Sequence, residues 1–126
     1  INFKSDLIYE DIRSFKDSYN LCKKLIAEDK MPEAIFISGD EKSFGVLKAL
    51  NEHKIEVPKE VSIIGFDNIP ISEFAIPALT TIEQQADKIV EETVNILMDL
   101  LSSEDHNSEM QKVVPTNLII RDSTGG

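Results

Sequence analysis

The chain has 126 residues, of which 13 are Lys or Arg and 23 are Asp or Glu, so its formal net charge is −10. This length supports one hydrophobic core but not two, and no apolar run approaches the roughly 20 residues of a membrane-spanning helix. Duplex binding needs clustered Lys and Arg, which are dispersed here, so the chain itself is not expected to hold DNA. A lone cysteine, Cys22, excludes an internal disulfide and favours a cytoplasmic location.

The first part of the sequence predicts a strand, a helix, a buried strand and a second helix. Residues 7–12 have the composition of a short strand, and residues 14–29 repeat apolar side chains at helical spacing. Residues 34–37 are continuously apolar, which is typical of a strand covered on both faces. Asp40 is a favourable N-cap for a helix that runs to about residue 53.

A second buried strand is predicted at residues 61–66, after a turn that contains Pro58. The two buried strands begin 61 − 34 = 27 residues apart with a helix between them. This arrangement is a βαβ crossover, which requires parallel pairing and a right-handed connection. The sequence therefore predicts an α/β fold with a parallel sheet flanked by helices.

The following segment, residues 69–79, contains two prolines and predicts an irregular connection with at most one helical turn, near residues 72–74. Residues 80–82 predict a brief extended piece.

A long helix is predicted over residues 85–102, followed by a solvated loop at residues 102–109 and terminal strands at residues 113–114 and 118–120. The apolar stripe of this helix needs a partner. Its members are Ala86, Val90, Val94, Leu97 and Leu101.

Two strand ends offer candidate binding residues, because open α/β sheets bind ligands beyond the carboxyl ends of their strands. Gly39 and Asp40 follow the first buried strand, and Gly39 lets the backbone approach a ligand closely. Asp67 follows the second, where a carboxylate can accept hydrogen bonds from the hydroxyls of a sugar or ribose. The alternatives are a plain helix cap for Asp40 and a loop carboxylate that binds turn N–H groups for Asp67.

No catalytic or cofactor motif emerges from the sequence, so we expect neither an enzyme nor a cofactor. His53 and His106 lack neighbouring ligand residues, so they are interpreted as surface histidines and no metal is expected. Cys22 falls at a helical core position and is interpreted as a small buried hydrophobe. The glycines fit neither phosphate-binding fingerprint, and Gly45 is expected to permit close helix packing.

A series of motifs covers nearly the whole chain, from about residue 7 to residue 123. It resembles the effector-binding domain of LacI/GalR-family bacterial transcription regulators. In chain order the motifs are PEAIF at 32–36, Gly39-Asp40 with Gly45, residues 57–58, VSIIGFDN at 61–68, PALTTI at 77–82 with Gln84, and LIIRDS at 118–123.

The resemblance implies a type I periplasmic-binding-protein-like fold of two Rossmann-like lobes that close on a small molecule. Residues 1–126 would be the C-terminal part of the effector-binding and dimerisation domain. The first lobe and a helix-turn-helix headpiece would lie upstream of Ile1, and operator DNA would contact only that headpiece. The orphan helix stripe would pack on the first lobe.

The resemblance also assigns roles to individual residues. Asp67 corresponds to an aspartate that binds effector hydroxyls, Phe36 to an apolar pocket position, and Gln84 to a polar residue at the crossover between lobes. Gly39-Asp40 replaces the Asn-Asp of many sugar-responsive members, which removes one possible effector hydrogen bond. The effector is expected to be a sugar or related metabolite.

Dimerisation in the family uses the second lobe, and the segment after Asp67 is rich in apolar residues that are hard to leave exposed. A homodimer patch is therefore predicted here, with ordinary packing beneath the loop as the alternative. Its residues are Ile69, Ile71, Phe74 and Ile76.

Two other functions remain open. A periplasmic sugar-binding protein of the same fold would carry a secretion leader in place of a headpiece. An enzyme of flavodoxin-like shape would need a nucleophile, base or metal set that the sequence lacks.

Overall fold

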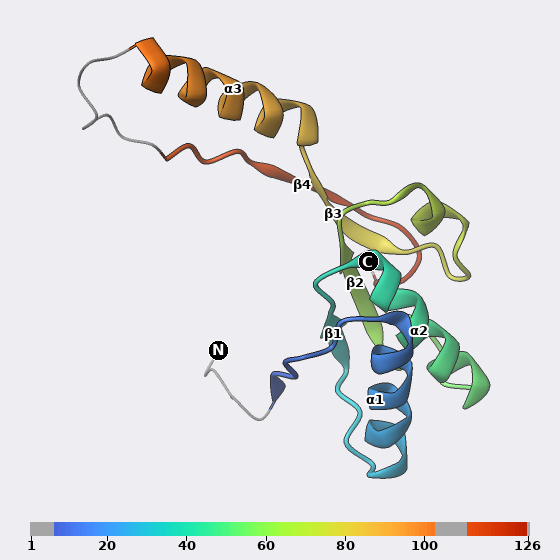
Figure 1. Ribbon diagram of the computed structural model, residues 1–126. Helices are drawn as coiled ribbons and strands as arrows, with labels where there is room; N and C mark the ends of the chain where they lie inside the picture. Colours follow the sequence, from blue (N-terminus) through green and yellow to red (C-terminus); the bar gives the residue numbers. More distant parts are fainter. Residues whose placement is uncertain (1–6, 103–110, 126) are drawn as a thin grey trace.

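The computed structural model describes residues 7–102 and 111–125 (Figure 1). Within them a single four-stranded sheet runs in the order β1-β2-β3-β4. Strands β1, β2 and β3 are parallel, and β4 is antiparallel to β3. The elements are α1 (Phe15–Ala27), β1 (Ala34–Phe36), α2 (Asp40–Glu52), β2 (Ser62–Phe66), the 3₁₀ helix η2 (Pro70–Phe74), β3 (Thr80–Gln84), α3 (Ala86–Ser102) and β4 (Thr116–Ile119). The predicted α/β class and the parallel βαβ unit are confirmed.

Helix α1 begins where its sequence offers a complete capping box. The Ser14 hydroxyl accepts from the Asp17 N–H at 3.2 Å, and the Asp17 carboxylate accepts from the Ser14 N–H at 3.0 Å. Two N–H groups at the helix start are satisfied in this way. These contacts lower the pKa of the Asp17 carboxyl. The largest contribution is the hydrogen bond from the Ser14 side chain, and the next is the hydrogen bond from the Arg13 N–H.

Helices α1 and α2 pack closely against each other and lie on the same side of β1 and β2 (Figure 1). Gly45 makes this approach possible, because a β-carbon there would overlap the Ser18 hydroxyl and the Phe15 carbonyl. The expected role of Gly45 is confirmed. The core between helices and sheet contains the fully buried side chains of Leu50, Ile63 and Leu79.

Two expectations for the first strands were wrong. Residues 8–13 form no strand, and Asp11 has a φ of 61°, which interrupts an extended backbone. Strand β1 is covered on one face only, because α1 and α2 lie on the side of Ile35 while Phe36 points to the other side and is 60% exposed.

The N-cap of α2 is Gly39 and not Asp40, which is the first residue of the helix. The expected cap was wrong because the Asp40 side chain is buried and bound to other partners, described below.

The irregular segment before β3 and the long helix after it are confirmed as η2 and α3. Residues 113–114 form no strand, so only β4 represents the predicted terminal strands. Helix α3 extends away from the sheet and has no buried residue (Figure 1). Its apolar stripe finds no partner among the residues that the structure describes. Of the loop predicted at residues 102–109, Ser102 is the last residue of α3. The rest of that loop, with His106, lies outside the described residues.

No helix within residues 7–102 and 111–125 combines the length and apolar character needed to cross a membrane.

Candidate functional site

Asp67 and Gln84 meet at one edge of the sheet, where the parallel strands β2 and β3 both end. The Gln84 side-chain amide donates to Oδ1 of Asp67 at 2.7 Å, and both side chains are exposed. The sequence placed both residues in the candidate site, and the structure brings them into contact.

The backbone that carries Asp67 turns sharply. Asp67 and Asn68 have φ values of 108° and 50°, in a region that costs about 1–3 kcal/mol for a residue other than glycine. Three N–H donors anchor the turn: Asp67 to Ile82 O at 2.8 Å, Asn68 to Thr81 Oγ1 at 3.3 Å, and Ile69 to Asp40 Oδ2 at 3.0 Å. The Asp67 side chain that this turn carries is exposed.

Gly39 lies beside Asp67 at the start of α2. A β-carbon on Gly39 would stand 3.9 Å from Oδ2 of Asp67 and 3.1 Å from Cε of Lys42, and its φ of 151° disfavours any side chain. The Lys42 ammonium donates to the Ser38 hydroxyl at 3.0 Å. A lysine and a carboxylate therefore flank the bare backbone at Gly39, and Lys42 is a site neighbour that sequence reasoning missed.

Asp40 lies behind this edge and not on it. Its side chain is 1% exposed. Oδ2 accepts from the Ser72 hydroxyl at 2.6 Å as well as from the Ile69 N–H, and Oδ1 accepts from the Thr81 hydroxyl at 2.6 Å. Because both oxygens are occupied by donors of the protein, Asp40 joins α2 to η2 and β3 and supports the turn at Asp67 from below.

Phe36 lies on the face of the sheet that α1 and α2 leave open. It packs edge-on against Phe66, with ring centroids 6.4 Å apart and an interplanar angle of 85°. Phe36 thus neighbours the residue that precedes Asp67.

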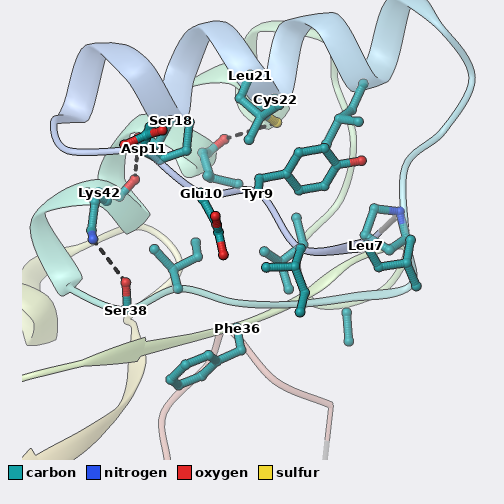
Figure 2. Close-up of a pocket in the computed structure, with 18 of the residues that line it drawn as sticks. Leu7, Tyr9, Glu10, Asp11, Ser18, Leu21, Cys22, Phe36, Ser38 and Lys42 are labelled. Carbon is teal, nitrogen blue, oxygen red and sulfur yellow. Dashed lines mark hydrogen bonds between the residues drawn. The ribbon is translucent and has the colours of Figure 1, made fainter. Parts of the chain in front are cut away.

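A cavity of about 690 Å³ lies between residues 7–12, α1, β1 and the start of α2 (Figure 2). Phe36 is the predicted effector residue that lines it, and Ser38 and Lys42 connect it to the edge near Gly39. Much of the wall is apolar, while the segment at residues 9–11 adds a tyrosine and two carboxylates. Sequence reasoning did not predict this wall, because residues 7–12 were expected to form a strand.

A second polar group was also missed by sequence reasoning. Arg121 donates from Nη2 to Asn68 Oδ1 and from Nη1 to Leu79 O, both at 2.8 Å, and Asn68 Nδ2 donates to Glu83 Oε1 at 2.8 Å. Arg121 belongs to the LIIRDS motif after the last strand, so the sequence marked the residue but not its contact.

The predicted dimer patch is largely exposed. Ile71, Phe74 and Ile76 are 58%, 73% and 93% exposed, whereas Ile69 is half-buried. Packing beneath the loop therefore describes Ile69 but not the other three residues.

The histidine and cysteine of the described region take structural positions. His53 ends α2, with Nδ1 2.8 Å from Ala49 O. Cys22 is buried in the core, as expected, and burial raises the pKa of its thiol to about 11. Within the described ranges, no group of three or more His, Cys, Asp or Glu side chains is arranged to hold a metal ion.

The family model of a periplasmic binding protein-like domain matches residues 4–124. Fold and strand-end site therefore define the class: a lobe of the periplasmic-binding-protein-like type, with its polar residues at the carboxyl edge of a parallel sheet.

Curated relatives narrow the class. The HTH-type transcriptional repressor PurR of Histophilus somni is 34% identical over 118 residues, which are 94% of this chain and 35% of that protein. The HTH-type transcriptional repressor MelR of Bacillus subtilis is 36% identical over 112 residues, 89% of this chain and 32% of that protein. The chain thus spans about a third of the length of these relatives.

Solved structures of transcription regulators also match this chain. The transcription regulator CcpA of Lactococcus lactis matches with a TM-score of 0.85 and 26% identity, over 99% of this chain and 45% of that one. A LacI-family regulator of Lactobacillus casei with bound sucrose matches with a TM-score of 0.77 and 25% identity, over 98% of this chain and 46% of that one. The chain belongs to the LacI/GalR family, whose members are non-enzymatic transcription regulators, and it corresponds to part of their effector-binding domain. These relatives favour a regulator over a periplasmic solute-binding protein.

Proposed function

We propose that this chain forms one wall of an effector pocket in a LacI/GalR-type repressor and that the effector is a small hydroxylated metabolite, a sugar or a close relative of one. The supporting observation is the exposed Asp67 carboxylate, whose Oδ1 is held by Gln84 while Oδ2 faces the bare backbone at Gly39. A carboxylate oriented in this way accepts hydrogen bonds from ligand hydroxyls.

Phe36, Gln84 and Gly39 complete the ligand contacts in this proposal. Gly39 offers close approach to the backbone, and Phe36 adds an apolar surface next to Phe66. Asp40 supports the site and does not touch the ligand, since its oxygens are bound within the protein. The sucrose bound to the Lactobacillus casei relative supports a saccharide as the first class of ligand to test.

Regulation would follow from closure of two lobes. A ligand that binds the closed state more tightly than the open state shifts the population toward closure. The first lobe and a helix-turn-helix headpiece would be supplied by the rest of the regulator, which would act in the cytoplasm. The strongly acidic chain described here would take no part in operator contact.

The regulator would act as a homodimer through Ile71 and Phe74 in η2 and Ile76 just after it, which are exposed apolar residues. An exposed apolar cluster of this kind marks an interaction surface more often than a free one. Ile69 would support the patch from beneath.

Calorimetric titration of the full-length regulator tests the ligand proposal. The probes are sucrose, D-galactose, D-ribose and, as a class that offers ring N–H donors instead of hydroxyls, hypoxanthine and guanine. We expect one of the saccharides to bind, and Asp67→Ala to weaken its binding by about tenfold or more, as loss of a charged hydrogen-bond acceptor predicts.

The matched control is Asp87→Ala, an exposed aspartate in the first turn of α3. This variant should bind like the wild type. Unchanged affinity in Asp67→Ala would remove Asp67 from the site, and binding of the bases without the saccharides would replace the proposed ligand class.

A further inference from the structure

Asp67 and Asn68 are consecutive residues with positive φ, and neither is glycine. Such a backbone persists only where its surroundings hold it in place. The turn is therefore expected to depend on contacts outside the turn itself, and the Asn68 side chain is where those contacts converge.

Asn68 is held between a cation and an anion. Its carbonyl oxygen accepts from the Arg121 guanidinium, and its amide nitrogen donates to the Glu83 carboxylate, each at 2.8 Å. The charges on either side leave one favourable orientation of the amide, with its oxygen toward Arg121 and its nitrogen toward Glu83.

Arg121 and Glu83, which bind the two ends of the Asn68 amide, each make a further hydrogen bond to the protein. The second guanidinium nitrogen of Arg121 donates to the Leu79 carbonyl at 2.8 Å, just before β3. The other oxygen of Glu83 accepts from Asn117 in β4 at 3.4 Å. The group therefore connects the turn after β2 to β3, to β4 and to the segment that follows β4.

We propose that Arg121 is a positioning residue of the effector site, which acts through Asn68 to hold the turn that presents the Asp67 carboxylate. The expected effect of Arg121 on ligand affinity rests on the proposed function. Its effect on the turn can be measured in the ligand-free protein. Arg121 does not touch the ligand. Its planar guanidinium makes two directed hydrogen bonds at once, which the single ammonium of a lysine reproduces poorly.

Hydrogen exchange on the ligand-free protein tests the positioning role, with Arg121→Lys compared with the wild type. Peptides that contain the Asp67 and Asn68 amides report the turn, and peptides from the middle of α2 report the core. We expect exchange at the turn to accelerate by about tenfold, as loss of one hydrogen bond predicts, with α2 unchanged.

Arg13→Lys is the matched control, because Arg13 forms an ion pair with Asp11 in which both side chains are more than 80% exposed. It should leave both peptides unchanged. Equal acceleration at the turn and in α2 would mean that Arg121 only stabilises the whole fold, and no acceleration at the turn would mean that it does not hold Asn68. Either result overturns the proposal.

The effect on the ligand is measured separately, with the saccharide that binds the wild type in the titration above. Arg121→Lys should weaken it by about tenfold, in proportion to the loosened turn. A loosened turn with wild-type affinity would overturn the positioning role while Asp67 remains a ligand contact. If no saccharide binds the wild type, the proposed function fails, and the exchange experiment alone decides whether Arg121 holds the turn.

Discussion

The Asp40 carboxylate lies directly over the backbone of Gly65, in space that a side chain on Gly65 would need. A β-carbon at Gly65 would overlap Oδ1 of Asp40 and approach Leu79 Cδ2 to 3.0 Å. Asp40 can therefore reach Thr81 on β3 only because the intervening residue of β2 is a glycine. In the Gly-Phe-Asp sequence at residues 65–67, Gly65 leaves room for the buried Asp40 carboxylate, and Asp67 itself supplies the exposed carboxylate.

Replacing Gly65 tests this relationship. In Gly65→Ala the new methyl group displaces the Asp40 carboxylate from at least one of its buried donors, so we expect a loss of about 2–3 kcal/mol in the free energy of unfolding. Urea denaturation measures the loss. Gly125→Ala is the control, because nothing lies within 4 Å of its β-carbon, and a similar loss in both variants would contradict the close approach.

Replacement by asparagine should have different effects on Asp40 and Asp67, lowering stability in one case and ligand affinity in the other. In Asp40→Asn an amide NH₂ faces donors in a buried site, and we expect the unfolding free energy to fall by about 2 kcal/mol. Asp67→Asn changes an exposed side chain, so it should stay within about 0.5 kcal/mol of the wild type and lose ligand affinity instead. Thermal unfolding and calorimetric titration of both variants separate the roles, and equal stability losses would contradict them.

The strand-end rule predicted Asp67 as a candidate from sequence alone, because the carboxyl ends of parallel strands share one edge of the sheet. Gln84 was predicted only by the family resemblance. The strand-end rule could not separate Asp67 from Asp40, since both aspartates follow a strand that the sequence predicted to be buried. The difference lies in Ser72 and Thr81, which are more than 30 residues away from Asp40 along the chain and close to it only in the fold. Sequence reasoning missed the role of Arg121 for the same reason, because its contact partner Asn68 is 53 residues away along the chain.

Local patterns had similar limits. The helical period predicted α1, α2 and α3 because helix formation depends on neighbours in sequence. The strand expected at residues 7–12 failed at Asp11, whose positive φ no apolar pattern reveals. Helix α3 was predicted correctly, and its apolar stripe is unpacked within the described residues. Its packing on the first lobe stays a prediction.

The exposed apolar patch of Ile71, Phe74 and Ile76, in and just after η2, should control assembly. Phe74→Glu places a charge on a side chain that is 73% exposed, so it should leave the fold intact while it disrupts an apolar interface. We expect light scattering to give the mass of a monomer for this variant and of a dimer for the wild type. Glu73→Ala changes the adjacent exposed residue of η2 and should remain a dimer. An unchanged mass for Phe74→Glu would exclude this patch as the interface.

The buried thiol of Cys22 makes stability depend on pH in the alkaline range. Burial favours the neutral thiol and raises its pKa to about 11 from an ordinary value of 9.0. The unfolded chain therefore releases the proton at lower pH than the folded one. The stabilising contribution is complete below the ordinary pKa and is lost as the pH rises toward 11.

Cys22→Ala removes this contribution and keeps the remaining titrations of the chain. Its small cavity should lower the unfolding free energy by about 1 kcal/mol at pH 7.5, and the difference from the wild type should shrink or reverse by pH 10.5, by about 1–2 kcal/mol. Urea denaturation at the two pH values measures both differences. A constant difference would show that the thiol ionises equally well in the folded and unfolded protein, which is incompatible with a side chain enclosed between α1 and α2.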